Sequence, residues 1–147
     1  MRTTLAEGAE LSRSVTVDAE RTIGFMGEDG RVYSTPDLLR DIEQTCRELL
    51  LAHADPGEDS VGIYVELKHM AATPPGFAVE ITARVSEVAD RRVRFAVTAH
   101  DTEEKVAEAV HDRFVVDTAR TVERLRAKAA REQQRAKAAR AAPDVRA

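Results

Sequence analysis

Residues 34–54 read STPDLLRDIEQTCRELLLAHA, and this stretch decides the fold because it predicts one long helix among segments that alternate like strands. Ser34 or Thr35 suits the N-cap, the proline that follows fits the first helical position, and Asp37 favours the positive end of the helix dipole. The sequence DPGEDS then ends the helix. About 18 residues rising 1.5 Å each give a helix of about 27 Å.

One side of this helix is apolar when its residues are placed at about 100° each. Glu43 falls about 20° beyond Leu50 on that wheel, at the edge of the apolar face. A boundary residue that reaches water is the simplest interpretation of Glu43, and Asp41 lies on the side predicted to be solvated. The apolar face is formed by Leu38, Leu39, Ile42, Cys46, Leu49 and Leu50, and the solvated side by Asp41, Gln44, Arg47 and Glu48.

The rest of the chain predicts an antiparallel sheet, because apolar residues recur with a period of two. The segments are 12–20, 60–69, 77–88, 91–100 and 105–117, and a helix over the first half of the last segment is the alternative. The residues expected to face the core are Val61, Ile63, Val65 and Leu67, then Val79, Ile81, Ala83 and Val85, then Val93, Phe95, Val97 and Ala99, and last Val106, Val110, Phe114 and Val116.

A strand, a long helix and then further strands suggest a sheet wrapped around a central helix, which is the hotdog layout. We therefore predict an α+β protein with one hotdog domain over 1–117. Its sheet has about five antiparallel strands around one central helix, and residues 118–147 form a C-terminal helical extension.

Length and composition exclude several classes of protein. A chain of 147 residues argues for one domain, and a single cysteine excludes an internal disulfide and a cysteine metal cluster. Trp is absent and aromatic residues are 4% of the chain, which makes nucleic-acid binding an unlikely activity of the body. There is no apolar run of signal-peptide or membrane-spanning length, so we expect a cytoplasmic protein with no membrane partner.

The basic C-terminal segment differs in charge from the body. Residues 118–147 contain nine Lys or Arg and three Asp or Glu, a net charge of +6, which leaves −10 for residues 1–117. RAKAAR occurs twice in this segment, and its residues are strong helix formers. The segment predicts a projecting helix that is either simply solvated or binds an acidic partner or nucleic acid.

Three polar residues together suit acyl transfer. Glu43 is ionised at neutral pH, so it can attack a carbonyl or activate water. Thr35 stands where a helix N-terminus presents N–H groups to an oxyanion, although its hydroxyl also fits an ordinary cap. His69 shares its parity with the apolar side of segment 60–69 and can polarise a carbonyl. As a strand-end histidine, His69 can instead turn to solvent or bond a backbone carbonyl.

These residues carry a resemblance to a known family. STP at 34–36, Glu43 eight residues after Thr35, VGIYVELKH at 61–69, TPPG at 73–76 and HDRFVV at 111–116 resemble the fluoroacetyl-CoA thioesterase-like family of hotdog proteins. The similarity runs from about residue 15 to residue 117.

The resemblance implies a homodimer that hydrolyses an acyl-CoA or acyl-carrier thioester at sites near the dimer interface. Glu43 would be nucleophile or general base, Thr35 would hydrogen-bond Glu43 and the reacting group, and His69 would support the carbonyl and leaving thiolate. Gly62 would let substrate approach the strand, and Arg113 would lie near the entrance, where a cation suits CoA phosphates. No metal and no cofactor are implied, since coenzyme A is part of the substrate.

The segment before the helix departs from the family pattern. The fluoroacetate-specific enzyme has a phenylalanine lid there, whereas this chain has Phe25 and Met26 but Asp29 in place of a second aromatic residue. We therefore expect Phe25 and Met26 to contact a larger or more polar acyl group. The alternative function within this fold is an acyl-CoA or hydrophobic-metabolite binding protein that does not hydrolyse its ligand.

Overall fold

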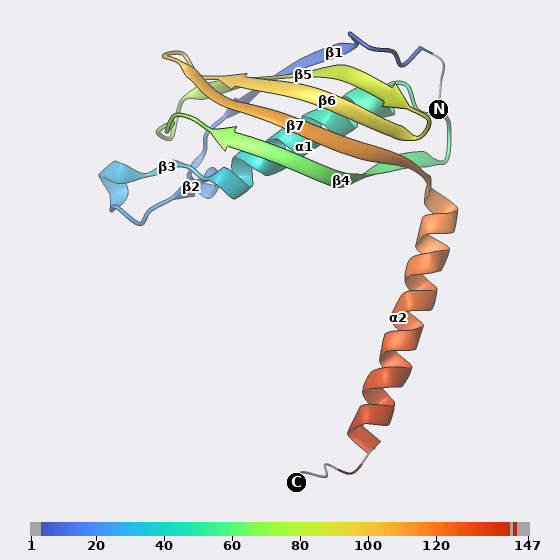
Figure 1. Cartoon of the computed structure of the whole chain (residues 1–147). Helices are drawn as coiled ribbons and strands as arrows, with labels where there is room; N and C mark the ends of the chain where they lie inside the picture. Colours follow the sequence, from blue (N-terminus) through green and yellow to red (C-terminus); the bar gives the residue numbers. More distant parts are fainter. Residues whose placement is uncertain (1–3, 142, 144–147) are drawn as a thin grey trace.

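A computed structural model describes residues 4–141 and Pro143, and its largest unit is a five-stranded antiparallel sheet. The strands lie in the order β1-β5-β6-β7-β4, and α1 crosses one face of the sheet (Figure 1). A projecting helix, α2, follows the last strand. The elements are β1 (Glu10–Thr16), β2 (Thr22–Ile23), β3 (Val32–Tyr33), α1 (Thr35–Leu51), β4 (Glu58–His69), β5 (Ala78–Ala89), β6 (Arg92–His100), β7 (Lys105–Asp117) and α2 (Thr118–Ala141).

The central helix forms largely as the sequence predicts, but its cap is Ser34. The Ser34 hydroxyl accepts a hydrogen bond from the Asp37 amide at 3.1 Å, and Pro36 occupies the first turn. The helix ends at Leu51, three residues earlier than expected. Because Ser34 caps the helix, the hydroxyl of Thr35 is available for a different contact.

Strand β4 contains a β-bulge that changes which residues face the helix. Its register against β7 shifts between Gly62 and Tyr64, so Ile63 is the additional residue. Val61 therefore pairs with the half-exposed Phe114 on the outer face, whereas Val65 pairs with the fully buried His111. The expectation that Val61 shares a face with Val65 is wrong, because one extra residue inverts the alternation.

Val106 is fully buried as predicted, but from Ala107 onward the buried side of β7 is the opposite of the predicted one. The odd-numbered residues from Ala107 to Val115 are buried, while Val110, Phe114 and Val116 are partly or largely exposed. A sequence with apolar residues on both parities does not by itself identify its inner face. The inner face of β7 consequently carries two polar side chains, those of His111 and Arg113.

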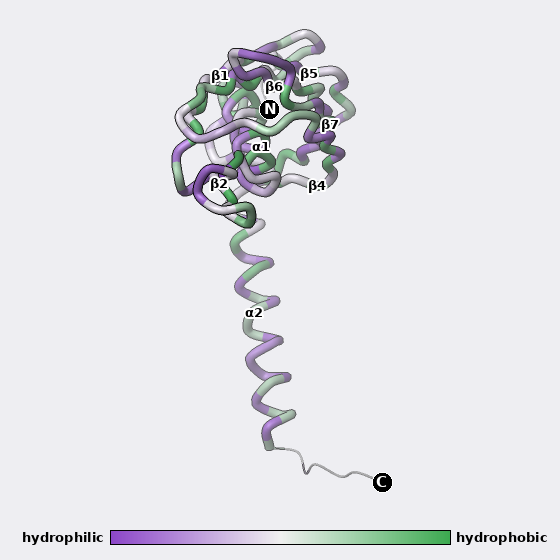
Figure 2. The backbone as a smooth tube through the Cα atoms, turned by 90° about the vertical axis from the view of Figure 1, so that its left-hand side faces the viewer, coloured by the Kyte–Doolittle hydropathy of each residue, from purple (hydrophilic) through white to green (hydrophobic). Residues whose placement is uncertain are grey.

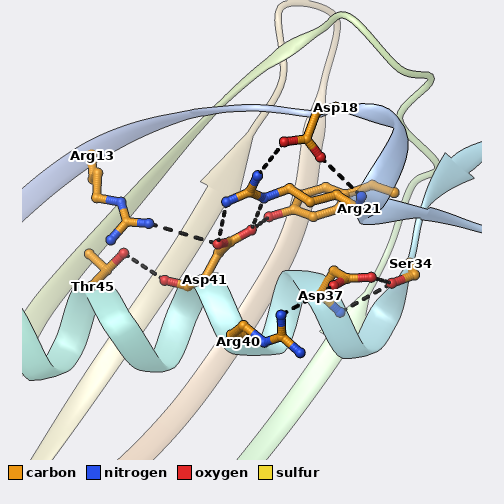
Figure 3. A network of polar contacts seen from close by, with 9 residues as sticks. Arg13, Asp18, Arg21, Ser34, Asp37, Arg40, Asp41 and Thr45 are labelled. Atoms are coloured by element: carbon orange, nitrogen blue, oxygen red, sulfur yellow. Dashed lines mark hydrogen bonds and ion pairs between the residues drawn. The ribbon is translucent and has the colours of Figure 1, made fainter.

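Asp41 lies in the protein interior, although the helical wheel places it on the solvated side. It is 2% exposed and receives two hydrogen bonds from the Arg21 guanidinium, at 2.9 and 3.2 Å, and one from the Tyr33 hydroxyl. Arg13 lies 3.8 Å away. Figure 3 shows these arginines converging on the carboxylate from β1 and from the segment before β2. The network connects the β2–β3 hairpin to α1. Because the hairpin covers this side of α1, the Asp41 carboxylate is buried there and is compensated by its hydrogen bonds.

The C-terminal helix α2 extends away from the sheet and contains no buried residue (Figure 1). Hydrophilic residues dominate along its length, as Figure 2 shows. The helical extension predicted from the sequence is therefore present, while its role as a separate unit stays a prediction. Across the described residues, no helix combines the length and the apolar character needed to cross a bilayer.

Candidate active site

The N-terminus of α1 and the end of β4 form one polar pair beside a cavity. The Thr35 hydroxyl oxygen lies 2.8 Å from Nδ1 of His69. The adjacent cavity measures about 330 Å³, which is within the usual range for small-molecule sites. Apart from Thr35, His69 and Ser34, its lining is predominantly apolar and comprises Ile23, Phe25, Val32, Tyr33, Met70, Ala71 and Ala72.

His69 has one ring nitrogen without a hydrogen-bond partner. Its Nε2 is buried and has no partner among the described residues. Burial lowers the pKa of His69, and a backbone contact with Ala71 offsets part of that effect. A neutral imidazole at pH 7 carries one N–H and one lone pair. If Thr35 donates to Nδ1, then Nε2 carries the proton and is a donor without a partner among the described residues.

Glu43 lies over Gly62 at the middle of α1. A Cβ atom built on Gly62 would lie 2.7 Å from Glu43 Oε1, so the carboxylate can keep its present position only over a glycine. The Glu43 side chain is 41% exposed, as expected for the edge of the buried face. The space over the Gly62 backbone is thus filled by the carboxylate, where the sequence had suggested an approaching substrate.

Arg113 is buried on the same side of Gly62 as Glu43, with its Nη1 3.5 Å from the position of a Cβ on Gly62. It is 7% exposed, so it does not lie at an open entrance, and the expected contact with CoA phosphates does not fit its position. Its Nε donates to the Ser60 hydroxyl at 2.7 Å and its Nη2 donates to the Ser60 carbonyl at 2.9 Å. Nη1 lies 3.1 Å from Nε2 of His111. Burial lowers the pKa of Arg113, while the charge of Glu43 raises it.

Within one chain, the Thr35–His69 pair and the Glu43 carboxylate are too far apart to act on the same bond. Thr35 and Glu43 are eight residues apart on one helix, which is a rise of about 12 Å. The hydroxyl of Thr35 bonds His69, and Glu43 has its nearest basic atom in His111 Nε2 at 3.8 Å. The predicted hydrogen bond between Thr35 and Glu43 is therefore not formed within one chain.

The two residues predicted to contact the acyl group, Phe25 and Met26, lie in the loop between β2 and β3. Phe25 is 88% exposed and lines the cavity beside Thr35 and His69. Met26 is 71% exposed and packs near Gly30 rather than in that lining. Phe25 is thus placed to contact a ligand in the cavity, whereas Met26 lies farther out.

His111 and Ser60 complete the polar group around Glu43, and sequence reasoning did not single them out. His111 is fully buried, and its Nδ1 lies 2.8 Å from the carbonyl oxygen of Tyr64. The signal that could have found it is its spacing of two positions from Arg113 in HDR, which places both residues on one face of a strand.

Comparison with known proteins agrees with the predicted resemblance. A family model described as fluoroacetyl-CoA-specific thioesterase matches residues 17–119. A fluoroacetyl-CoA thioesterase of Streptantibioticus cattleyicolor is 34% identical over 85 residues, which are 58% of this chain and 61% of that protein. The match therefore spans less than two thirds of that relative.

Two solved structures have the same fold. A thioesterase superfamily member from Thermus thermophilus has a TM-score of 0.82 at 25% identity, over 90% of this chain and 98% of that one. A variant of a fluoroacetyl-CoA-specific thioesterase, solved with fluoroacetate and CoA, has a TM-score of 0.74 at 27% identity, over 80% and 99% of the two chains. The predicted family and the hotdog fold class are both confirmed.

Proposed function

Because this chain belongs to the fluoroacetyl-CoA-specific thioesterase family, we propose that it hydrolyses an acyl-CoA thioester to the free acid and the thiol. The single observation that carries the proposal is the Thr35–His69 pair, which lines an apolar cavity of about 330 Å³ and contains a buried ring nitrogen without a partner among the described residues. The relative solved with fluoroacetate and CoA supports an acyl-CoA as substrate.

The proposed chemistry divides between the two polar groups. The Glu43 carboxylate removes a proton from water, the resulting hydroxide attacks the thioester carbonyl carbon, and the C–S bond breaks. The proton held by Glu43 then goes to the departing thiolate. His69 Nε2–H donates to the carbonyl oxygen, where negative charge develops, and Thr35 fixes the imidazole tautomer. Direct attack by Glu43 on the carbonyl remains the alternative, with an anhydride as intermediate.

We also propose that two copies complete each site. β4 pairs with β7 on one side and with no described strand on the other, and Val61, Ile63, Tyr64 and Val65 leave it with an exposed apolar run. A long apolar edge strand needs a cover. Antiparallel pairing of two β4 strands centred on Val65 would set Gly62 of one copy opposite the segment 67–69 of the other. Glu43 of one copy would then meet His69 and Thr35 of the second copy.

The acyl group is proposed to be small to medium in size and largely apolar. The cavity lining is aliphatic around the Thr35–His69 pair, and Phe25 lines it from the β2–β3 loop.

We propose no metal or other cofactor, because the carboxylate, imidazole and hydroxyl suffice for the steps above. Cytoplasmic location is proposed with the same function, since acyl-CoA substrates and a single reduced thiol suit that compartment.

Thiol release from a panel of acyl-CoA and acyl-carrier thioesters tests the proposal. We expect turnover with at least one substrate and a loss of about 10²–10⁴-fold in Glu43→Gln, the range for removal of a general base. The control is Gln44→Glu, an exposed neighbour on the same helix, which leaves turnover unchanged. Tight ligand binding without any thiol release would instead favour the non-hydrolytic binding protein.

Complementation between variants tests the shared site. Glu43→Gln and His69→Ala each inactivate a homodimer. In a mixed dimer, one site receives the intact Glu43 and the intact His69 from different chains, and the other site carries both changes. Co-expression is therefore expected to restore thiol release. If each chain held a complete site, the mixed dimer would stay inactive.

A further inference from the structure

The buried His111 has no part in the chemistry proposed above, yet it hydrogen-bonds Arg113 and lies 3.8 Å from Glu43. It comes from β7, its ring stacks near Phe95 with centroids 6.5 Å apart, and it is fully enclosed. Its Cε1 lies 3.1 Å from the position of a Cβ on Gly62. In a polar ring that is buried so completely, both nitrogens are expected to have hydrogen-bond partners.

The hydrogen-bond partners determine the tautomer of His111. The Tyr64 carbonyl can only accept, so Nδ1 carries the proton in the 2.8 Å contact. Nε2 of the neutral ring is then a lone pair, and it accepts the Nη1–H of Arg113 at 3.1 Å. A proton on Nε2 would oppose that N–H donor and place a second positive charge beside the guanidinium.

Each of the three nitrogens of the Arg113 guanidinium donates a hydrogen bond. Ser60 accepts from Nε and Nη2, and His111 accepts from Nη1. These three bonds fix a buried cation near the Glu43 carboxylate, since Nη1 and Glu43 Oε1 lie 3.5 and 2.7 Å from the same Cβ position on Gly62. His111 is the one of the three contacts that also lies near Glu43, with Nε2 3.8 Å from Oε1.

We propose that His111 is a positioning residue for the reaction: its neutral, Nδ1-protonated ring is oriented by the Tyr64 carbonyl and aligns Arg113 near Glu43. The β-bulge at Ile63 places the Tyr64 carbonyl where the ring can reach it, so the bulge orients the catalytic carboxylate through two side chains. The expected effect on kcat rests on the proposed function, whereas the tautomer of His111 and its contacts do not depend on any activity.

Burial favours the neutral ring of His111 more strongly than the surrounding charges do. Burial lowers the pKa of His111, as does the charge of Arg113 on the same strand. Glu43 on α1 and Asp112 on β7 act in the opposite direction, as does the bond to Tyr64 on β4. Phe95 is the neighbour on β6 and has no titratable group.

Three substitutions separate positioning from packing. His111→Gln retains an acceptor for Arg113, His111→Asn retains only a donor for Tyr64, and His111→Leu retains neither. We expect kcat to fall about tenfold to a hundredfold in the Leu and Asn variants with KM unchanged, because the acceptor for Arg113 is lost. His111→Gln should recover most of that loss. His100→Leu, an exposed histidine on β6, is the matched control and leaves kcat unchanged.

Nitrogen-15 NMR of the histidine side chains is the second arm, and it needs no turnover. We expect His111 to show protonated Nδ1 and unprotonated Nε2 at pH 7, and to titrate below pH 6.5, where an unperturbed imidazole titrates. An Nε2-protonated ring or an imidazolium at pH 7 overturns the inference.

The two arms distinguish failure of the inference from failure of the proposed function. A wild-type protein with no thioesterase activity refutes the function and leaves NMR to decide the geometry of His111. A wild-type enzyme whose kcat is unchanged in His111→Leu, or for which Gln is no better than Asn, overturns the positioning role alone.

Discussion

Replacing Gly62 by alanine tests the placement of Glu43 with a single methyl group. The new Cβ would lie 2.7 Å from Glu43 Oε1, whereas ordinary contacts begin at 3.4 Å, so the carboxylate must retreat by about 0.7 Å. His111 Cε1, at 3.1 Å from the new atom, must yield by a few tenths of an ångström. Gly62 is not among the residues with positive φ, so alanine itself adds no backbone strain.

The expected effect is on the rate rather than on the fold. A misplacement of about 1 Å can cost 10²-fold in rate, so a retreat of about 0.7 Å predicts a loss of roughly tenfold to hundredfold in kcat, or about 1.4–2.7 kcal/mol. Glu43 is the end of a flexible, half-exposed side chain and moves cheaply. Alanine also restricts the unfolded chain by about 0.4–1 kcal/mol, so the free energy of unfolding should change by less than about 1 kcal/mol.

Steady-state thiol release and urea unfolding of Gly62→Ala measure the two quantities. The same substitution is also made in Glu43→Gln, where the methyl group should cost nothing further if it acts through the carboxylate. An unchanged kcat in Gly62→Ala would refute the argument that Glu43 over Gly62 is the catalytic placement. A further loss in the double variant would show that the methyl group acts on substrate or on Arg113 instead.

Three further predictions concern stability. Asp41→Ala should lower the free energy of unfolding by about 2–4 kcal/mol in urea, because it leaves Arg21 and the Tyr33 hydroxyl without their buried acceptor. Asp59→Ala, which breaks the more exposed pair with Arg47, should cost about 0–1 kcal/mol, and equal losses would contradict the role of burial. Burial lowers the pKa of His69 and His111, so the unfolded chain binds more protons below about pH 6.5. Their contribution is complete above pH 6.5 and is lost as the pH falls toward the folded-state values; unfolding at pH 7.5 and 5.5 should show this slope, and His111→Gln should reduce it. Ending the chain after Thr121 should change the free energy of unfolding by less than about 1 kcal/mol, because no residue of α2 is buried. A larger drop in calorimetry would show that α2 packs against another copy.

Local signals in the sequence were sufficient for the elements and for the family. The cap, proline and apolar face of residues 34–54 predict α1, and the alternation in β5 and β6 predicts their inner faces correctly. Glu43 lies at the edge of the buried face, as the wheel indicates. These features depend on neighbours within a few positions along the chain, which is why periodicity detects them.

Contacts between distant segments were not accessible in the same way. Asp41 is a polar residue on the side of the helix predicted to be polar. It is buried because Arg13 of β1 and Arg21 of the segment before β2 pack over that side. The wheel has no information about a hairpin that folds over the helix. The burial of Arg113 was missed for the same reason, since its partners Ser60 and His111 are identified only once β4 and β7 are paired.

The bulge in β4 connects the misassigned strands to the site. One extra residue at Ile63 moves Val61 to the outer face and keeps Gly62, Val65 and His69 on the face toward the helix. Without it, either Gly62 or His69 would point away from α1, because side chains alternate strictly along a regular strand. A glycine is needed under Glu43 and a histidine is needed beside Thr35, seven positions later. An odd separation on one face requires an irregularity between them, so the bulge is the feature that lets one strand serve both polar groups.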